Sequence, residues 1–186
     1  MILTCAALGL ERINDEVYVS NDPYARIGAN HMEFIKQQAR SSARGRARIC
    51  AHRTSDDSLH EMLIGVTEAS YIRPHRHLGK AESFHIVEGA VDVVVFDQTG
   101  QVVEVVELGA PASGRDFFYR MSDSLFHTLV LRTPLLVVHE VTTGPLRREQ
   151  TEYGAFSPDE TETEAVGHYN ARVRDAASRF CATIQR

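Results

Sequence analysis

The sequence has no tryptophan, only two lysines and only three cysteines. Cys5, Cys50 and Cys181 are far apart and odd in number, which fits a reducing compartment better than a disulfide framework. No internal repeat, low-complexity run or long apolar stretch is present, so the sequence indicates neither a solenoid nor a membrane protein. The apolar segment from Met1 to Leu10 lacks the basic residues of an export signal, and we therefore expect a cytoplasmic protein.

An excess of positive charge is also missing. The 186 residues carry a formal net charge of -5, which does not favour attraction to nucleic acid or to anionic lipid. Hydrophobic residues make up 43% and charged residues 24% of the chain, as in ordinary globular proteins. We expect a single folded domain with terminal extensions, and no nucleic-acid or membrane partner.

Short β-type runs separated by turn residues dominate the middle of the chain. Nine of them are expected, at residues 46–52, 59–67, 71–75, 83–87, 91–97, 102–108, 117–119, 125–131 and 135–142. No segment between them is long and helical enough to connect parallel strands. The pattern predicts an all-β fold, either a barrel or a double-sheet roll.

Helical patterns lie on both sides of these runs. Residues 21–40 show helical periodicity, with Asp22-Pro23 and Asn30 as candidate starts. Ser157-Pro158-Asp159-Glu160 has the features of a second helix start. The apolar stripe that follows Ser157 should pack on the barrel or on a second subunit. The expected organisation is an N-terminal helical extension over residues 1–45, a β-barrel over 46–145 and a C-terminal helical tail over 146–186.

Two histidines and a glutamate form the most informative cluster. His75 and His77 alternate along a strand and therefore share a face, while Glu82 follows a short turn at the start of the next strand. A barrel interior that gathers two imidazoles and a carboxylate needs a cation to offset the cost of burying them. The spacing therefore favours a metal site.

The same residues carry a resemblance to a known superfamily. His75, His77, Glu82 and Gly89 match the first motif of the cupin superfamily, and His127 matches the histidine of its second motif. Cupins usually place proline and glycine before that histidine, where this chain has Ser122 and Ser124. The resemblance implies a cupin double-stranded β-helix, or jelly-roll, barrel in which His75, His77, Glu82 and His127 hold one divalent metal ion.

Within cupins, residues 39–160 resemble the WbuC family of cupin-fold metalloproteins, which is named from polysaccharide O-antigen gene clusters. The shared segments are Ala39-Arg40-Ser41-Ser42 with His52, His60-Glu61-Met62, residues 71–77, Lys80-Ala81-Glu82-Ser83-Phe84, residues 96–100 and Thr143-Gly144-Pro145. Members of that family often carry tryptophan at two positions where this chain has Phe126 and Phe156-Ser157.

The ligand types do not select one metal. Mixed nitrogen and oxygen donors suit Fe, Mn, Ni, Co, Cu and Zn alike. Three imidazoles and one carboxylate would leave one or two positions of an octahedral ion open to water or to a substrate oxygen.

Four further residues are candidates for substrate binding. Tyr71 and Arg73 share the face of His75 by alternation and are candidates for holding an anionic or hydroxyl-rich ligand, with ordinary packing and ion pairing as the alternative. His60 is a weaker candidate, because its strand could face either way. Only one of His139 and Glu140 should face the interior, and Glu140 is favoured.

The basic cluster at Arg40, Arg44, Arg46, Arg48 and Arg53 could bind phosphate, but a solvated surface is the preferred interpretation for so acidic a chain.

The leading functional hypothesis is a metal-dependent enzyme acting on a small oxygen-rich molecule such as a sugar derivative, with isomerase-like Lewis-acid chemistry. An Fe(II) dioxygenase is a rival within the enzyme class, and a non-catalytic binding or sensing protein is a rival outside it. The residues name no general base. Exposed barrel edges and terminal segments favour a homodimer.

Overall fold

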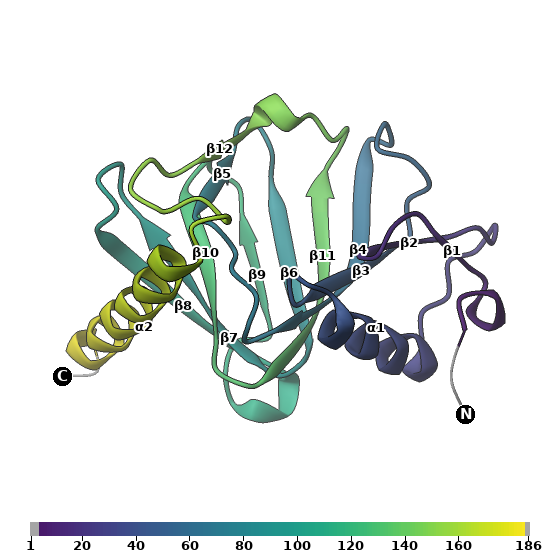
Figure 1. The fold of residues 1–186 in the computed structure, drawn as a ribbon, viewed down its shortest axis with the longest axis horizontal. Coiled ribbons are helices and arrows are strands. Elements are labelled where there is room, and N and C mark those ends of the chain that lie inside the picture. Colours follow the sequence, from purple (N-terminus) through teal and green to yellow (C-terminus); the bar gives the residue numbers. More distant parts are fainter. Residues whose placement is uncertain (1–3, 185–186) are drawn as a thin grey trace.

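The computed structural model describes residues 4–184, and the outermost residues of both expected extensions lie outside this range. The described chain contains two main helices and twelve strands (Figure 1). The helices are α1 (Ala29–Ser41) and α2 (Thr163–Ile184), with short 3-10 helices at Ala6–Leu8, Pro111–Ser113 and Arg148–Gln150. The strands are β1 (Leu10–Arg12), β2 (Val17–Ser20), β3 (Arg46–Cys50), β4 (Leu59–Thr67), β5 (His75–His77), β6 (Glu82–Glu88), β7 (Ala90–Phe96), β8 (Val102–Gly109), β9 (Phe118–Met121), β10 (Phe126–Leu131), β11 (Leu135–Thr143) and β12 (Thr151–Tyr153).

The strands form two sheets that enclose a common interior. One has the order β1-β2-β3-β4-β11-β6-β9 and the other β12-β5-β10-β7-β8. Eight consecutive strands, β4 to β11, divide between the sheets as β4-β11-β6-β9 and β5-β10-β7-β8, which is the strand order of a jelly roll. The expected double-sheet roll is therefore confirmed by strand pairing.

Three strands and one strand position differ from the expectation. β1 and β2 extend the seven-stranded sheet, with β2 parallel to β3, so the N-terminal extension is not only helical. β12 lies in the expected helical tail and pairs with β5. The strand expected at residues 71–75 instead covers His75–His77, because Pro74 has no N–H to donate to a neighbouring strand.

One end of the barrel interior is apolar. Side chains from both sheets pack there, including Ile86, Val93, Leu131, Leu136 and Val138. The turn between β6 and β7 closes this end through Gly89, whose φ is 92° and whose missing Cβ would lie 2.5 Å from the carbonyl oxygen of Leu135. This glycine of the sequence motif thus has a conformational role.

Helix α1 covers the outer face of the seven-stranded sheet (Figure 1). It begins at Ala29, next to the candidate start at Asn30 and not at Asp22-Pro23. Phe34, Ile35 and Ala39 are buried against Ile49, Leu63 and other residues of β3, β4 and β11.

Helix α2 covers the other side of the barrel (Figure 1). Its buried residues Tyr169, Val173 and Ala177 pack on the five-stranded sheet. The apolar stripe of this helix therefore covers the barrel of its own chain. The expected start at Ser157 is wrong, because the Ser157 hydroxyl donates to the carbonyl oxygen of Gly154 and the helix begins at Thr163. None of the described helices is long and apolar enough to cross a membrane.

A buried carboxylate joins two loops to the five-stranded sheet. Asp92 is 1% exposed and pairs with Arg115 at 3.1 Å and with Arg132 at 2.6 Å.

We expect Asp92→Ala to lower the free energy of unfolding by about 2–3 kcal/mol, because both arginines lose charged hydrogen bonds that are partly shielded from water. Urea denaturation measures the change. Asp175→Asn, at an exposed position of α2, is the control and should change stability by less than about 0.5 kcal/mol. Equal effects of the two substitutions would contradict this role of Asp92.

Candidate metal centre

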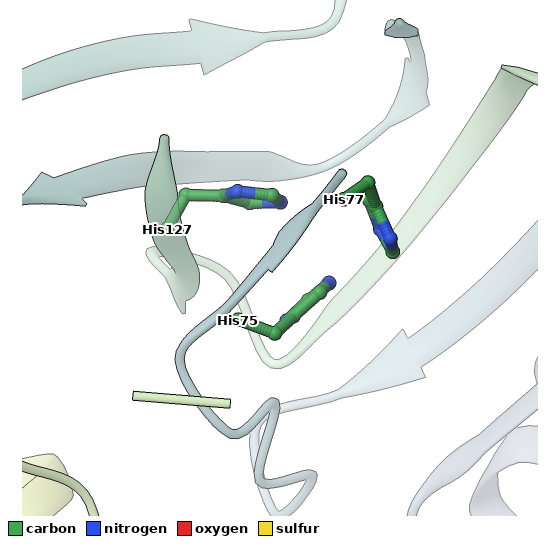
Figure 2. A group of neighbouring side chains, drawn as sticks. All are labelled: His75, His77 and His127. Carbon is green, nitrogen blue, oxygen red and sulfur yellow. The ribbon is translucent and has the colours of Figure 1, made fainter. Parts of the chain in front are cut away.

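Three histidine side chains converge inside the barrel. His75 and His77 come from β5, and His127 comes from the neighbouring strand β10, where it lies directly opposite His75. One ring nitrogen from each of the three lies within 4.8 Å of the others. Figure 2 shows the rings directed toward a common space.

Each imidazole is held through its Nδ1 atom. The Nδ1 atoms of His75 and His127 lie 2.8 and 3.0 Å from the carbonyl oxygens of Arg73 and Leu125. A carbonyl can only accept, so both Nδ1 atoms carry the proton. The Nδ1 of His77 lies 3.3 Å from the hydroxyl of Thr151 on β12. All three Nε2 atoms are thereby left to face the shared space, as in histidines that bind metals.

Glu82 lies beside two of the three imidazoles. Its carboxylate oxygens are 3.1 Å from Nε2 of His127 and 3.5 Å from Nε2 of His77, and the hydroxyl of Tyr119 donates to it at 2.7 Å. The set of mutually close nitrogens contains the three histidines without Glu82. The carboxylate therefore borders the cluster and is fixed there by Tyr119.

The pKa shifts reflect a crowded, enclosed site. Burial, together with His127 and His77, lowers the pKa of His75 to about 3, and burial also lowers the pKa of His77. Burial opposes protonation of His127, but the Glu82 carboxylate outweighs it and raises the His127 pKa. Burial likewise opposes ionisation of Glu82, yet His127 and Tyr119 lower its pKa to about 2. His75 and His77 are therefore neutral and Glu82 is ionised, which are the protonation states that a divalent cation requires. His127 would have to release the proton that Glu82 favours before its Nε2 atom could bind an ion.

The donor set fits a transition metal. Imidazole nitrogen suits Zn, Cu, Fe and Ni. Nitrogen ligands about 2.1 Å from one ion lie about 3–4 Å from each other, and the ring nitrogens here lie within 4.8 Å of one another. The His75, His77 and His127 cluster could therefore hold a metal ion.

The cluster lies in a cavity of about 290 Å³. Arg73 and Glu140 line this cavity, and burial, with the neighbouring Glu82 carboxylate, raises the pKa of Glu140 to about 7. His139 lies outside the lining, within 3.9 Å of Glu61, as the alternation of the strand requires.

Two of the four candidate substrate contacts lie elsewhere. Tyr71 packs against Tyr169 of α2 and donates its hydroxyl to the carbonyl oxygen of Pro158. His60 is buried and stacked on His52, with ring centroids 4.1 Å apart. Neither is among the residues that line the cavity.

The sequence analysis missed a basic wall in this cavity. Arg44, Arg46 and Arg48 line it, in place of the solvated surface that we preferred for this cluster. The signal that could have found two of them is period-two alternation along β3. Arg46 and Arg48 share a face with Cys50, which belongs to the barrel core.

The departures from the cupin and WbuC patterns have local substitutes. Ser124, at the position where cupins usually have glycine, donates its hydroxyl to the carbonyl oxygen of His77 at 2.7 Å. This bond ties the turn before β10 to β5. Phe126 and Phe156, which stand where tryptophan is common, contact each other edge to face with centroids 5.6 Å apart.

The sequence profile of DUF6016, a domain of unknown function, matches residues 27–108, which is less than half of the chain. No curated protein sequence matches this chain.

Solved structures share the general architecture. A protein from Shewanella oneidensis is 13% identical with a TM-score of 0.47, over 67% of this chain and 77% of its own. A Klebsiella pneumoniae protein with a double-stranded β-helix domain is 12% identical with a TM-score of 0.45, over 59% and 79%. A sugar phosphate isomerase from a cupin superfamily, from Silicibacter pomeroyi, is 20% identical with a TM-score of 0.37, over 47% and 52%. Since all three TM-scores are below 0.5, the assignment of a jelly roll rests on the strand order of this chain.

Removing one imidazole should remove the metal. We expect His77→Ala and His127→Ala each to lower the metal content of the purified protein from about one ion per chain to nearly none, because two nitrogens bind a divalent ion far more weakly than three. Elemental analysis by mass spectrometry measures this, and circular dichroism checks folding. His168→Ala, on the exposed face of α2, should retain full metal content. Unchanged metal content in the folded His77 and His127 variants would refute the assignment.

The support of His77 by β12 can be tested separately. Thr151→Val removes the hydroxyl beside Nδ1 of His77 while keeping a β-branched strand residue. We expect metal affinity to fall about tenfold, the lower end of losses seen when the partner of a metal-bound histidine is removed. Competition with a chromophoric chelator measures the affinity. Wild-type affinity in this variant would show that Thr151 does not orient the ring.

Proposed function

We propose that this protein is a metal-dependent cupin of the WbuC type that acts on a small oxygen-rich molecule, such as a sugar derivative, by isomerase-like chemistry. One observation carries the proposal: three histidines from two strands distant in sequence direct their Nε2 atoms into one cavity, with every Nδ1 atom already engaged. In this proposal His75, His77, His127 and Glu82 hold one divalent ion. The ion supplies Lewis acidity, which polarises a substrate oxygen.

The residues around the cluster have separate tasks in this proposal. Tyr119 keeps the Glu82 carboxylate turned toward the histidines. The apolar side chains of Ile64, Leu129 and Val138 line the deeper part of the cavity and limit the water that reaches the substrate. Arg73 and Glu140 line the same cavity and are proposed to contact the substrate.

The proposal extends to the assembly and its compartment. We propose a homodimer, since β9 and β8 end the two sheets and expose Phe118 and Val103 at their edges. We also retain the cytoplasm as the proposed compartment, on the basis of three widely spaced cysteines.

The decisive experiment identifies the metal and then looks for turnover. Protein purified without added metal and without a polyhistidine tag is analysed for bound elements, reloaded with each candidate metal and incubated with a panel of sugars and nucleotide sugars. We expect one metal form to convert a member of the panel to an isomer, detected by nuclear magnetic resonance. Oxygen consumption that depends on Fe(II) would instead favour a dioxygenase, and tight binding without product would favour a non-catalytic sensor.

Glu82 has its own test, because its oxygens lie beside the cluster rather than inside it. Glu82→Gln keeps the size of the side chain and an acceptor for Tyr119, but it removes the negative charge. We expect metal affinity to fall at least tenfold if Glu82 is the fourth ligand. The control is Glu164→Gln, at an exposed position in the first turn of α2. Equal affinities of wild type and Glu82→Gln would limit the ligand set to the three histidines.

A further inference from the structure

The cavity contains one guanidinium group whose charge the described residues leave unpaired. Arg48 lines the cavity from β3, and its Nη1 atom meets only a weak acceptor, the thioether sulfur of Met62, at 3.9 Å. Arg48 forms no ion pair with a carboxylate in the part of the chain that the structure describes. Arg48 is half-buried in a partly open cavity, so its donors are available to a ligand that supplies a carboxylate.

The other arginines of the cavity are already neutralised. Arg44 pairs with Glu16 at 3.3 Å, and both Arg44 and Arg46 pair with Glu160, at 2.9 and 3.1 Å. Arg73 pairs with Asp159 at 2.7 Å. Arg46 nevertheless keeps one buried donor, its Nε, without an acceptor among the described residues. Arg46 and Arg48 alternate along β3 and share the interior face, so their unused donors belong to one wall.

This wall belongs to the sheet opposite the histidines. Arg46 and Arg48 come from the seven-stranded sheet, whereas the histidines come from the five-stranded sheet. Glu140 lies on the same wall as the arginines, two strands from β3 across β4, and it forms no ion pair with Arg48. A molecule in the cavity could therefore reach the Arg48 guanidinium, the Glu140 carboxyl group and the histidine cluster at the same time.

We propose that the substrate of this cavity is a small hydroxycarboxylate, such as a sugar acid, whose carboxylate is bound by Arg48. The inference rests on the proposed function, since it names the substrate class of the same site. The planar guanidinium group of Arg48 can bind a carboxylate through two parallel hydrogen bonds. The Nε atom of Arg46 lies on the same wall and offers an additional donor. A substrate hydroxyl donates to Glu140, and the remaining oxygens face the histidines.

Charge and size both favour a carboxylate over a phosphate. Arg48 is the one guanidinium of the cavity lining without a carboxylate within ion-pair distance among the described residues, and its single charge balances that of one carboxylate. A phosphate dianion would bring a second negative charge into a cavity that Glu140 also lines. The volume of about 290 Å³ corresponds to about ten water-sized groups, which suits an acid of three to six carbons.

The test compares acids with their neutral polyols. Glycerate, threonate and gluconate are titrated calorimetrically against glycerol, threitol and glucitol, with inorganic phosphate as a further probe. Both the metal-free and the Zn²⁺-loaded protein are used. We expect at least one acid to bind ten- to hundredfold more tightly than its polyol, and Arg48→Gln to abolish this preference. Arg40→Gln, which removes the same charge from the exposed end of α1, is the matched control and should retain it.

The outcomes separate this inference from the proposed function. If no acid exceeds its polyol, or if the preference survives in Arg48→Gln, the inference is wrong even when a neutral sugar is turned over. If phosphate alone shows binding that depends on Arg48, the assignment of a carboxylate is wrong. An acid preference that depends on Arg48 in metal-free protein, together with a failure to bind metal or to turn over any acid, supports the inference and contradicts the proposed function.

Stability provides a second readout. We expect Arg48→Gln to leave the unfolding temperature unchanged or to raise it, because the guanidinium has no carboxylate partner to lose. If Arg48→Gln does not fold, Arg48→Lys keeps the charge and loses the fork, and most of the acid preference should disappear. Full preference in Arg48→Lys would contradict two-pronged recognition by Arg48.

Discussion

The geometry of the candidate metal centre depends on the pairing of a strand that is only three residues long. β5 carries His75 and His77, and it is held on one side by β10 and on the other by β12. The register with β10 places His75 opposite His127, and the register with β12 places His77 opposite Thr151. A shift of one residue would turn both histidines of β5 to the outer face. The site therefore requires β12, a segment that follows the jelly roll in sequence.

Several contacts hold that register. Arg76 lies between the two histidines and points away from them, where it pairs with Glu152 directly opposite on β12 and lies over the ring of Phe126. Ser124 binds the carbonyl oxygen of His77 from the turn before β10. The outward side of β5 thus carries the interactions that fix the strand, while its inward side remains available for chemistry.

Polarity changes along the barrel axis, strand by strand. The interior face of β11 reads Leu136, Val138 and Glu140, and that of β10 reads Leu131, Leu129 and His127. Each strand contributes apolar residues at one end and one ionisable residue at the other. The apolar end provides the packing that stabilises the fold, which leaves the polar end free to contain groups that contribute nothing to stability. The cavity begins where the apolar packing ends.

Spacing along single strands was readable from the sequence, whereas pairing between distant strands was not. His-x-His predicted that His75 and His77 share a face, because side chains alternate along a strand. The resemblance to cupins, and not the spacing, supplied His127. The strand β12 escaped prediction, since three residues after a barrel carry no periodic signal. The start of α2 was also misplaced. Ser157 has the features of a helix cap, but its hydroxyl donates to the carbonyl oxygen of Gly154 in a buried turn.

The basic wall shows why composition is a poor guide to individual side chains. Because the overall charge is -5, a solvated surface was the natural interpretation of a run of arginines. Net charge, however, describes the protein as a whole, whereas alternation along a strand decides which way each side chain points. Ala47 and Ile49 pack outward under α1, which turns Arg46 and Arg48 inward. The helix that stabilises the outer face of the sheet thereby determines which charges enter the cavity. Packing on one side of β3 sets the chemistry available on the other.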